Sequence, residues 1–348
     1  MSTAPRLPAE WEAQSAIMLT WPHDRQHWQD GIAGVERVFA DIVRLVSAYQ
    51  DVLIVCIDSR HRQHVQEHLA TSEAHPARIH LAIAPSNDCW ARDHGPIGIK
   101  KGDATLFLDF HFNGWGGKYP ADRDNAITKN LARAGVFGKT PVASVDWVLE
   151  GGSIDTDGHG TVLTTRSCLL NESRNGTRSQ SQVESELGRT LGLRRFLWID
   201  HSRLSGDDTD GHIDMLARFI DPDTIAYAGC EDPDNANDTR LQGLATEIHA
   251  LRRADGRPYR LVELPTPRPI RDSSGRQLPA SYANFLITNE QVLVPTYAQP
   301  SDSLALACLQ ANFPGRELVS IDCLPLIRQY GSLHCVTQQI PAGIPIHD

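Results

Sequence analysis

The chain has 348 residues, of which 41% are hydrophobic and 22% are charged, and its formal net charge is −10. This composition is typical of a globular protein with a buried core. The negative charge argues against a protein that binds nucleic acid through a basic face. Because a negative cleft attracts cations, the charge balance favours a positively charged ligand.

The sequence predicts no targeting or membrane segment. Its first residues contain no apolar signal core, and no apolar run is long enough to cross a bilayer. The seven cysteines include no pair at C-x-x-C spacing, which argues against zinc ribbons and thioredoxin-type redox sites. An odd number of cysteines without a secretory signal predicts free thiols in a reducing compartment. We therefore expect a cytoplasmic protein with neither membrane nor nucleic acid among its partners.

Helical and strand patterns alternate along the chain. Apolar residues at helical spacing predict a helix over residues 34–49, and the β-branched run 51–57 predicts a buried strand. Residues 61–69 and 79–83 repeat this pair. Later strands are predicted over residues 105–110, 141–148, 161–165, 196–199, 224–228, 259–264, 284–287, 291–295 and 318–322, and later helices over residues 125–134, 181–191, 239–253 and 303–312. Because no linker interrupts the pattern, we expect one α/β domain over residues 1–348.

Four chemically distinctive loops follow one another at a regular spacing. Asp93, Glu150, His212 and Cys335 are separated by 57, 62 and 123 positions, so the last gap is about twice the others. Units of about sixty residues that each contribute one loop would leave one unit, near residues 280–284, without evident chemistry. A radial arrangement of such units would bring the loops to one central site, as in propellers.

Cys335 is the candidate nucleophile. Most free cysteines are small buried hydrophobes, but Gly331 and His334 beside this one favour a strand end or turn. A cysteine attacks as the thiolate, and a histidine is its usual base. His334 is expected to point away, because successive residues of a strand face opposite sides. The same alternation places His212 and Asp214 on one face, which makes His212 the better partner.

The acidic residues of the other loops suit a planar cation. Asp93 and Asp214 together could hold a guanidinium through parallel charge-assisted hydrogen bonds, although Asp93 could instead form an ion pair with Arg92. Trp90 offers a flat face to a cation or alkyl chain, or belongs to the core. Glu150 closes an apolar strand and needs a partner, and orienting the catalytic histidine is a natural role for it.

Neither a metal nor a cofactor is predicted. The acidic run 207–211 resembles part of a calcium-binding loop, but it lacks the third acid and the closing glutamate. No glycine-rich phosphate loop follows a strand in the required way, so nucleotide cofactors are unsupported.

Taken together, these stretches resemble the agmatine deiminase family, relatives of the bacterial-type peptidylarginine deiminases in the guanidine-modifying superfamily. The resemblance covers most of the chain and includes residues 8–12, 20–23, 169–175, 281–285, 294–295 and the segment around Cys335. It implies a five-bladed β/α propeller with pseudo-fivefold symmetry (pentein-type), without a cofactor, and suggests a homodimer. It also implies hydrolysis of agmatine to N-carbamoylputrescine and ammonia through a cysteine thiouronium intermediate, in putrescine and polyamine biosynthesis.

The resemblance further implies a role for each candidate residue. Cys335 would be the nucleophile, His212 the general acid and base, Asp93 and Asp214 the guanidinium ligands, Glu150 the residue that steadies His212, and Asp208 a ligand for the amine end of agmatine.

Three alternatives stay open. A peptidylarginine or free-arginine deiminase would need cationic groups for the substrate carboxylate, or an open cleft for a peptide. An amidinotransferase would share the thiouronium intermediate but pass the amidino group to an amine. A non-catalytic protein that binds polyamines or metal through the same loops would have no use for Cys335 as a nucleophile.

Overall fold

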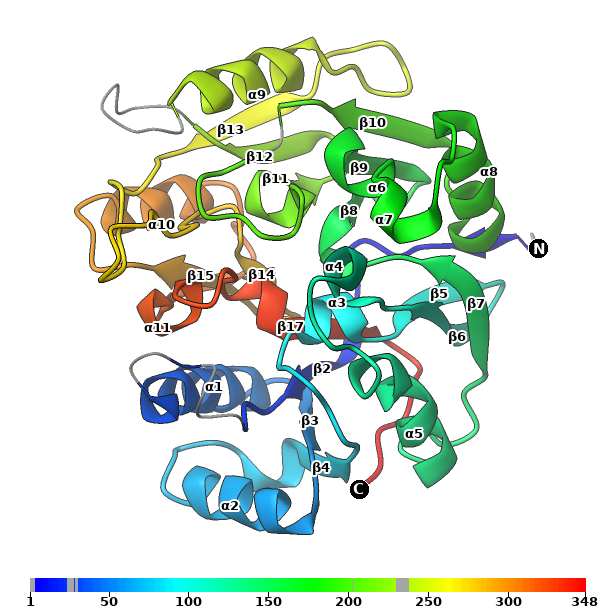
Figure 1. The fold of residues 1–348 in the computed structure, drawn as a ribbon, viewed down its shortest axis with the longest axis vertical. Coiled ribbons are helices and arrows are strands. Elements are labelled where there is room, and N and C mark those ends of the chain that lie inside the picture. The colour runs from blue at the N-terminus through cyan, green and yellow to red at the C-terminus, as the bar shows by residue number, and fades with distance from the viewer. Residues whose placement is uncertain (1–3, 24–27, 29–30, 202, 230–237) are drawn as a thin grey trace.

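The computed structural model describes residues 4–23, 28, 31–201, 203–229 and 238–348. Within these residues the strands form five separate sheets, which Figure 1 shows spread around the middle of the molecule with the longer helices toward the periphery. The mixture of helices and strands confirms the α/β prediction. No helix in the described part of the chain has the length and apolar character needed to span a bilayer.

Each sheet contains three or four strands, which in spatial order are β17 (Thr337–Pro341), β2 (Gln14–Thr20), β3 (Asp51–Cys56) and β4 (Ile79–Ile83); β1 (Pro5–Arg6), β5 (Ile97–Lys101), β6 (Ala104–His111) and β7 (Val142–Val148); β10 (Arg195–Ile199), β9 (Thr161–Thr165) and β8 (Ile154–Thr156); β11 (Ala217–Asp221), β12 (Thr224–Ala228) and β13 (Arg260–Leu264); and β14 (Leu286–Ile287), β15 (Gln291–Thr296) and β16 (Glu317–Asp322).

The helices are of two kinds. The α-helices are α1 (Ile32–Ser47), α2 (Ser59–Leu69), α3 (Ala91–His94), α4 (Gly114–Gly117), α5 (Ile127–Ala134), α6 (Arg166–Leu169), α7 (Glu172–Asn175), α8 (Gln180–Leu191), α9 (Asp238–Ala250), α10 (Asp302–Gln310) and α11 (Leu324–Ile327). The 3₁₀ turns are η1 (Pro76–Arg78), η2 (Asp124–Ala126), η3 (Gly151–Ser153), η4 (Ile213–Met215) and η5 (His334–Val336).

All five sheets contain one three-strand unit with the same pairing, to which the two four-stranded sheets add β1 or β4. An antiparallel pair of strands is followed by a parallel pair, as in β8–β9–β10, β11–β12–β13 and β14–β15–β16. A helical segment connects each parallel pair, as βαβ crossovers require. In the sheet that contains β2, the antiparallel partner is β17, from the opposite end of the described chain. This sheet therefore ties the two ends of the fold together.

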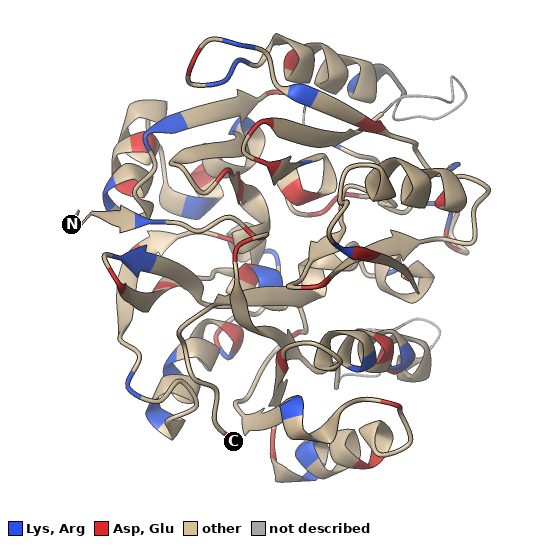
Figure 2. Ribbon diagram, turned by 180° about the vertical axis from the view of Figure 1, so that it is seen from behind, with Lys and Arg blue, Asp and Glu red and all other residues tan. Residues whose placement is uncertain are grey.

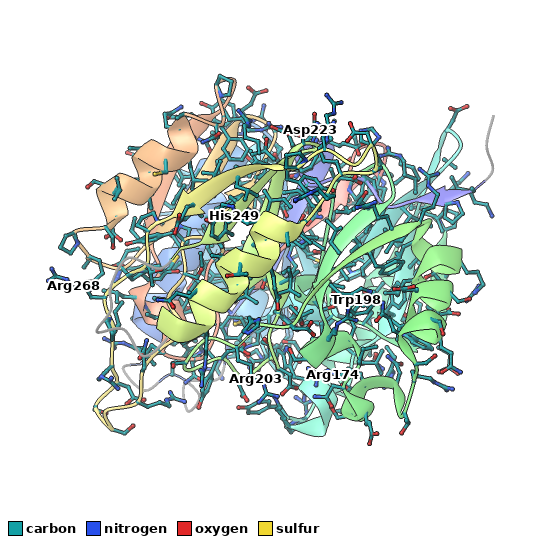
Figure 3. All side chains as sticks on the ribbon, turned by 90° about the horizontal axis from the view of Figure 1, so that it is seen from above. Arg174, Trp198, Arg203, Asp223, His249 and Arg268 are labelled. Atoms are coloured by element: carbon teal, nitrogen blue, oxygen red, sulfur yellow. The ribbon has the colours of Figure 1, made fainter. Side chains whose placement is uncertain are left out.

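The helices form where the sequence supplies an apolar stripe and terminal caps. Val35, Phe39 and Ile42 recur at helical spacing in α1 and are buried. A capping box between Ser179 and Gln182 begins α8, and such caps typically stabilise a helix by about 1 kcal/mol. Figure 3 looks onto α9 and shows it lying over the strands of its sheet, with which it is in contact at β12.

Positive and negative residues are interspersed over the described surface. Figure 2 shows Lys and Arg on several sheets and helices, with Asp and Glu between them. Several of these charges form exposed ion pairs, including Arg189 with Glu186 and Arg257 with Asp255. Exposed pairs of this kind contribute little stability, about 1 kcal/mol or less.

The predicted elements are confirmed with small shifts at their ends, but several strands were omitted. The strand predicted over residues 284–287 is reduced to β14, and the helix predicted over 239–253 ends at Ala250. The sequence interpretation omitted β2, and it also omitted β5, β8, β11 and β17, which are first strands of their repeats. These first strands have three to five residues, which is too short for a clear period-two pattern.

Two glycines should respond oppositely to alanine. A Cβ at Gly34 in α1 would meet its nearest neighbours at 3.7 Å, whereas a Cβ at Gly98 in β5 would lie 2.4 Å from Pro341 Cδ. We expect Gly34→Ala to raise the free energy of unfolding by about 0.5–1 kcal/mol, because glycine is a poor helix former. We expect Gly98→Ala to lower it by roughly 1–3 kcal/mol through overpacking. Urea unfolding of the two variants tests this, and equal shifts would contradict it.

Candidate active site

The candidate residues lie in short turns that precede the first strands of the sheets. Asp93 is in α3, before β5, and Glu150 immediately precedes η3 and β8. His212 immediately precedes η4 and β11, and Cys335 is in η5, before β17. Because α3 contacts η3 and η5, and η3 contacts η4, four distant loops of the sequence meet at one centre.

Gly152 shows how closely these groups approach one another. A Cβ at this position would lie 2.6 Å from His212 Nδ1, 2.9 Å from Asp93 Oδ1 and 3.1 Å from Asp214 Oδ2. Only a residue without a side chain leaves room for three polar groups at such distances. The glycine pair that follows Glu150 is therefore part of the site's geometry.

Asp93 and His212 face each other in a buried setting. Asp93 accepts hydrogen bonds from Trp115 Nε1 (2.9 Å) and from the Gly152 N–H (3.1 Å), and its Oδ1 lies 3.5 Å from His212 Nδ1. Burial alone would lower the pKa of His212, but the negative charge of Asp93 and its other neighbours raises that pKa well above the ordinary value. This shift favours the protonated imidazolium.

Glu150 is fully buried and is held by an arginine. Its Oε1 accepts a hydrogen bond from Arg174 Nε (2.8 Å), and its Oε2 lies 3.9 Å from His212 Nε2. Burial would raise the pKa of Glu150, but His212 and Arg174 together lower it. Arg174, labelled in Figure 3, also bonds Asp210 (2.6 Å) and the Thr209 carbonyl (3.0 Å). Sequence patterns assigned Arg174 no function, because an arginine beside an asparagine carries no specific signal.

The surroundings of Cys335 correct the prediction for the unit near residues 280–284. Asn284 Nδ2 lies 3.5 Å from Cys335 Sγ, and Asn284 Oδ1 accepts a hydrogen bond from the His334 N–H (2.9 Å). The fifth unit therefore does supply a site residue, although asparagine alone gives little chemical signal in a sequence. Burial, together with the charges of Asp214 and Asp93, raises the pKa of Cys335 well above its ordinary value. This shift favours the neutral thiol over the thiolate.

His334 does not lie on a strand, so the reason given for its direction was wrong, although the ring does not line the cavity at Cys335. Residues 334–336 form the turn η5, so strand alternation does not apply. His334 Nδ1 lies 2.8 Å from Asp214 Oδ2, and its Nε2 lies 2.7 Å from Glu10 Oε2. The same oxygen of Asp214 is 3.8 Å from Cys335 Sγ. His334 thus stands directly behind a carboxylate that contacts the thiol.

The local structure around His212 and Asp214 was also mispredicted, although both side chains reach the site. Residues 213–215 form η4 instead of a strand, and a turn brings the two side chains together around Gly152. Burial would raise the pKa of Asp214, but the hydrogen bond from His334 and nearby positive charges lower it. Arg92, the alternative partner of Asp93, forms its ion pair with Glu10 at 3.5 Å.

A cavity of about 370 Å³ opens onto the thiol. Cys335, Asp93, Trp90 and Asp208 all contribute to its lining. The full set of lining residues is Asp88, Trp90, Asp93, Trp115, Tyr119, Asp208, Thr209, Gln329, Tyr330, Gly331 and Cys335. Among the described residues, three carboxylates and four aromatic rings line this cavity, and no Lys, Arg or His does so. A cavity with this lining suits an elongated cation.

In the acidic run 207–211, one carboxylate is hydrogen-bonded to backbone N–H groups of the same loop. Asp207 accepts hydrogen bonds from the N–H groups of Thr209 (3.1 Å) and Gly211 (2.7 Å). Asp208 instead points to the cavity, where it accepts a hydrogen bond from the Tyr119 hydroxyl (2.6 Å) and lies 3.5 Å from Lys118 Nζ. The loop therefore places one carboxylate at the cavity wall.

Comparison with known proteins shows the family to which this chain belongs. The sequence profile of the Porphyromonas-type peptidyl-arginine deiminase family matches residues 6–341. The chain is 32% identical to agmatine deiminase of Pseudomonas aeruginosa, over 97% of this chain and 95% of the relative.

Solved structures of deiminases are also similar to this chain over nearly its full length. A Porphyromonas gingivalis structure, provisionally named arginine deiminase, is 44% identical, with a TM-score of 0.92, over 98% of this chain and 99% of its own. A cysteine-to-serine variant of C. jejuni agmatine deiminase with substrate bound is 34% identical, with a TM-score of 0.89, over 98% and 97%.

The raised pKa of Cys335 should be visible in its reaction with iodoacetamide. Without a ligand, we expect the midpoint of the pH profile of Cys335 alkylation to lie above pH 9.0, the ordinary thiol value, because only the thiolate reacts. Asp214→Asn removes one charge that raises the pKa, so its midpoint should move to lower pH. Mass spectrometry of the peptide that contains Cys335 measures this, with Cys335→Ser as the blank. A wild-type midpoint at or below pH 9.0 would contradict a raised pKa.

Proposed function

Because the chain belongs to the Porphyromonas-type peptidyl-arginine deiminase family, we propose that it is an agmatine deiminase. The reaction is hydrolysis of the guanidinium of agmatine to N-carbamoylputrescine and ammonia, a step in putrescine biosynthesis. The observation that carries this proposal is the cavity, which leads to the Cys335 thiol past three carboxylates and has no Lys, Arg or His among its described lining residues.

The first half of the proposed reaction forms a covalent intermediate. Asp93 and Asp214 bind the guanidinium by charge-assisted hydrogen bonds and fix its central carbon near Cys335 Sγ. The bound cation offsets the two carboxylates that raise the thiol pKa, so binding itself favours the thiolate. Cys335 then attacks the carbon, a C–N bond breaks, and His212 donates the proton with which ammonia leaves. The product of this step is an S-alkylthiouronium.

The second half restores the enzyme. His212, now neutral, takes a proton from a water molecule that attacks the thiouronium carbon. The C–S bond breaks, and the product leaves with a ureido group. Glu150, held by Arg174 at 2.8 Å, keeps the imidazole in place and balances its positive charge. Splitting one displacement into two steps is the general advantage of covalent catalysis.

The cavity wall supports agmatine over arginine. Agmatine ends in an ammonium group, for which the Asp208 carboxylate is a suitable partner, and Trp90 provides a flat face for the alkyl chain. Free arginine would bring an α-carboxylate close to Asp88 and Asp208, where like charges repel. The arginine or peptidylarginine alternative draws its support from the provisional name of the 44% identical relative. An amidinotransferase or a non-catalytic polyamine-binding or metal-binding protein has no specific observation in its favour.

We extend the proposal to the architecture. The five sheets with one pairing order would be the blades of a β/α propeller with pseudo-fivefold symmetry, and residues 1–348 would form one catalytic domain. The protein would act in the cytoplasm as a homodimer, without a cofactor. Light scattering of the purified protein tests the dimer, and a monomeric mass would contradict it.

Product analysis tests the reaction and the substrate together. Purified protein is incubated separately with agmatine, free arginine and a capped arginine peptide, and the ureido product is measured. We expect turnover of agmatine, and a decrease of roughly 10³-fold or more in Cys335→Ser, because the covalent route is lost. Preference for arginine or for the peptide would retain the chemistry and overturn the substrate. The absence of product from all three would contradict the proposed function.

Asp208→Asn tests the binding of the amine end. Because the ion pair is half-exposed, we expect a loss of about 1 kcal/mol, which corresponds to a roughly fivefold higher KM for agmatine with little change in kcat. An alkylguanidine of the same length without the amine is the matched control substrate, and its KM should not change. Equal changes for both substrates would show that Asp208 does not recognise the amine.

A further inference from the structure

A second thiol lies behind the catalytic histidine and has no part in the proposed reaction. Cys168, in α6, is fully buried, and its Sγ lies 3.7 Å from Glu150 Oε2. Three possible ligand atoms, one each from Cys168, Glu150 and His212, lie within 4.8 Å of one another. Nitrogen, carboxylate oxygen and sulfur are the three donor types that Zn²⁺ takes in proteins.

Two features of this cluster point to a missing partner. His212 Nε2 is buried and has no hydrogen-bond partner, although it faces the cluster at 3.9 Å from Glu150 Oε2. Glu150 uses Oε1 for Arg174, which leaves Oε2 directed at both other donors. The Glu150 Oε2 atom lies 3.9 Å from His212 Nε2 and 3.7 Å from Cys168 Sγ, which is close to the spacing of neighbouring donor atoms around one ion. Zinc bonds to N, O and S donors measure about 2.0–2.3 Å.

From this geometry we propose that His212, Glu150 and Cys168 form an inhibitory site for Zn²⁺. Zn²⁺ binds an imidazole nitrogen and a thiolate only in their deprotonated forms, so the ion would displace protons from these donors.

The ion would stop turnover without occupying the substrate cavity. A metal on Nε2 leaves the remaining ring proton on Nδ1, which faces Asp93 at 3.5 Å. The ring can then no longer alternate between imidazolium and imidazole, and both proton transfers by His212 are lost. Cys168 and Glu150 are not among the lining residues of the cavity, and the proposed guanidinium ligands Asp93 and Asp214 are not ligands of the ion, so the guanidinium can still bind. This kinetic consequence rests on the proposed function, whereas the metal site itself does not.

A different site for the ion makes a different prediction. Zn²⁺ held by the Cys335 thiol would stand where the guanidinium carbon must be and would compete with agmatine. The Cys168 site predicts a lower kcat with little change in KM, and the Cys335 site predicts a higher KM. The two sites also require different cysteines, which provides a test independent of activity.

Co²⁺ is the spectroscopic probe for the binding test, because a thiolate ligand gives it a charge-transfer absorption. The titration uses the full chain as wild type, Cys335→Ser, Cys168→Ser, Cys168→Ala and Cys323→Ala, the last as a buried thiol outside the cluster. We expect the band in wild type, Cys335→Ser and Cys323→Ala, its loss in both Cys168 variants, and its displacement by Zn²⁺. Circular dichroism confirms that each variant is folded.

The outcomes separate the alternatives. No band in folded wild type or Cys335→Ser, or a band that survives in folded Cys168→Ser, overturns the site. If neither Cys168 variant folds, Glu150→Gln takes their place and should weaken Zn²⁺ binding beyond the roughly 10–100-fold typical of losing an outer-shell partner. Binding should also release protons into weak buffer. If the band behaves as expected but no guanidine is hydrolysed, the metal site stands and the proposed function fails.

Discussion

The structure depends on holding three carboxylates together in one buried space. Asp93, Glu150 and Asp214 are each 5% exposed or less, and like charges removed from water raise one another's energy steeply. Each has a specific partner: His212 faces Asp93, Arg174 bonds Glu150, and His334 bonds Asp214. The negative site is therefore stable only with the positive groups around it.

Beyond these partners, buried side chains of alternating positive and negative charge follow one another away from the site. His334 contacts Glu10, Glu10 contacts Arg218 at 2.9 Å, and Arg218 forms an ion pair with Asp155. All of these groups are buried, so the removal of one member would leave its neighbour as an unpaired charge, which typically costs about 3–5 kcal/mol. A residue far from the thiol, such as Glu10, is thereby tied to the electrostatics of the site.

Some elements and site residues could be predicted from the sequence, and others could not, because residues differ in how clear a sequence pattern they form. Helices and strands such as residues 51–56 and 180–191 can be predicted from their pattern of apolar residues. The acid-rich loops can be recognised from their composition. Strands β5, β8, β11 and β17 have only three to five residues, which is too few for a clear alternation of apolar and polar residues. His334 was misjudged because strand alternation was applied to a turn, and Asn284 was missed because its amide matters only through a contact between two distant loops. Contacts of that kind are fixed by tertiary structure.

The pairing of β17 with β2 has a consequence for biosynthesis. β2 leaves the ribosome early and β17 late, so this sheet remains without its antiparallel edge through most of translation. η5, which carries Cys335, directly precedes β17 and is in contact with it. Contacts between such distant segments form slowly. The carboxylates of the site therefore leave the ribosome first, and the reactive sulfur can join them only near the end of synthesis.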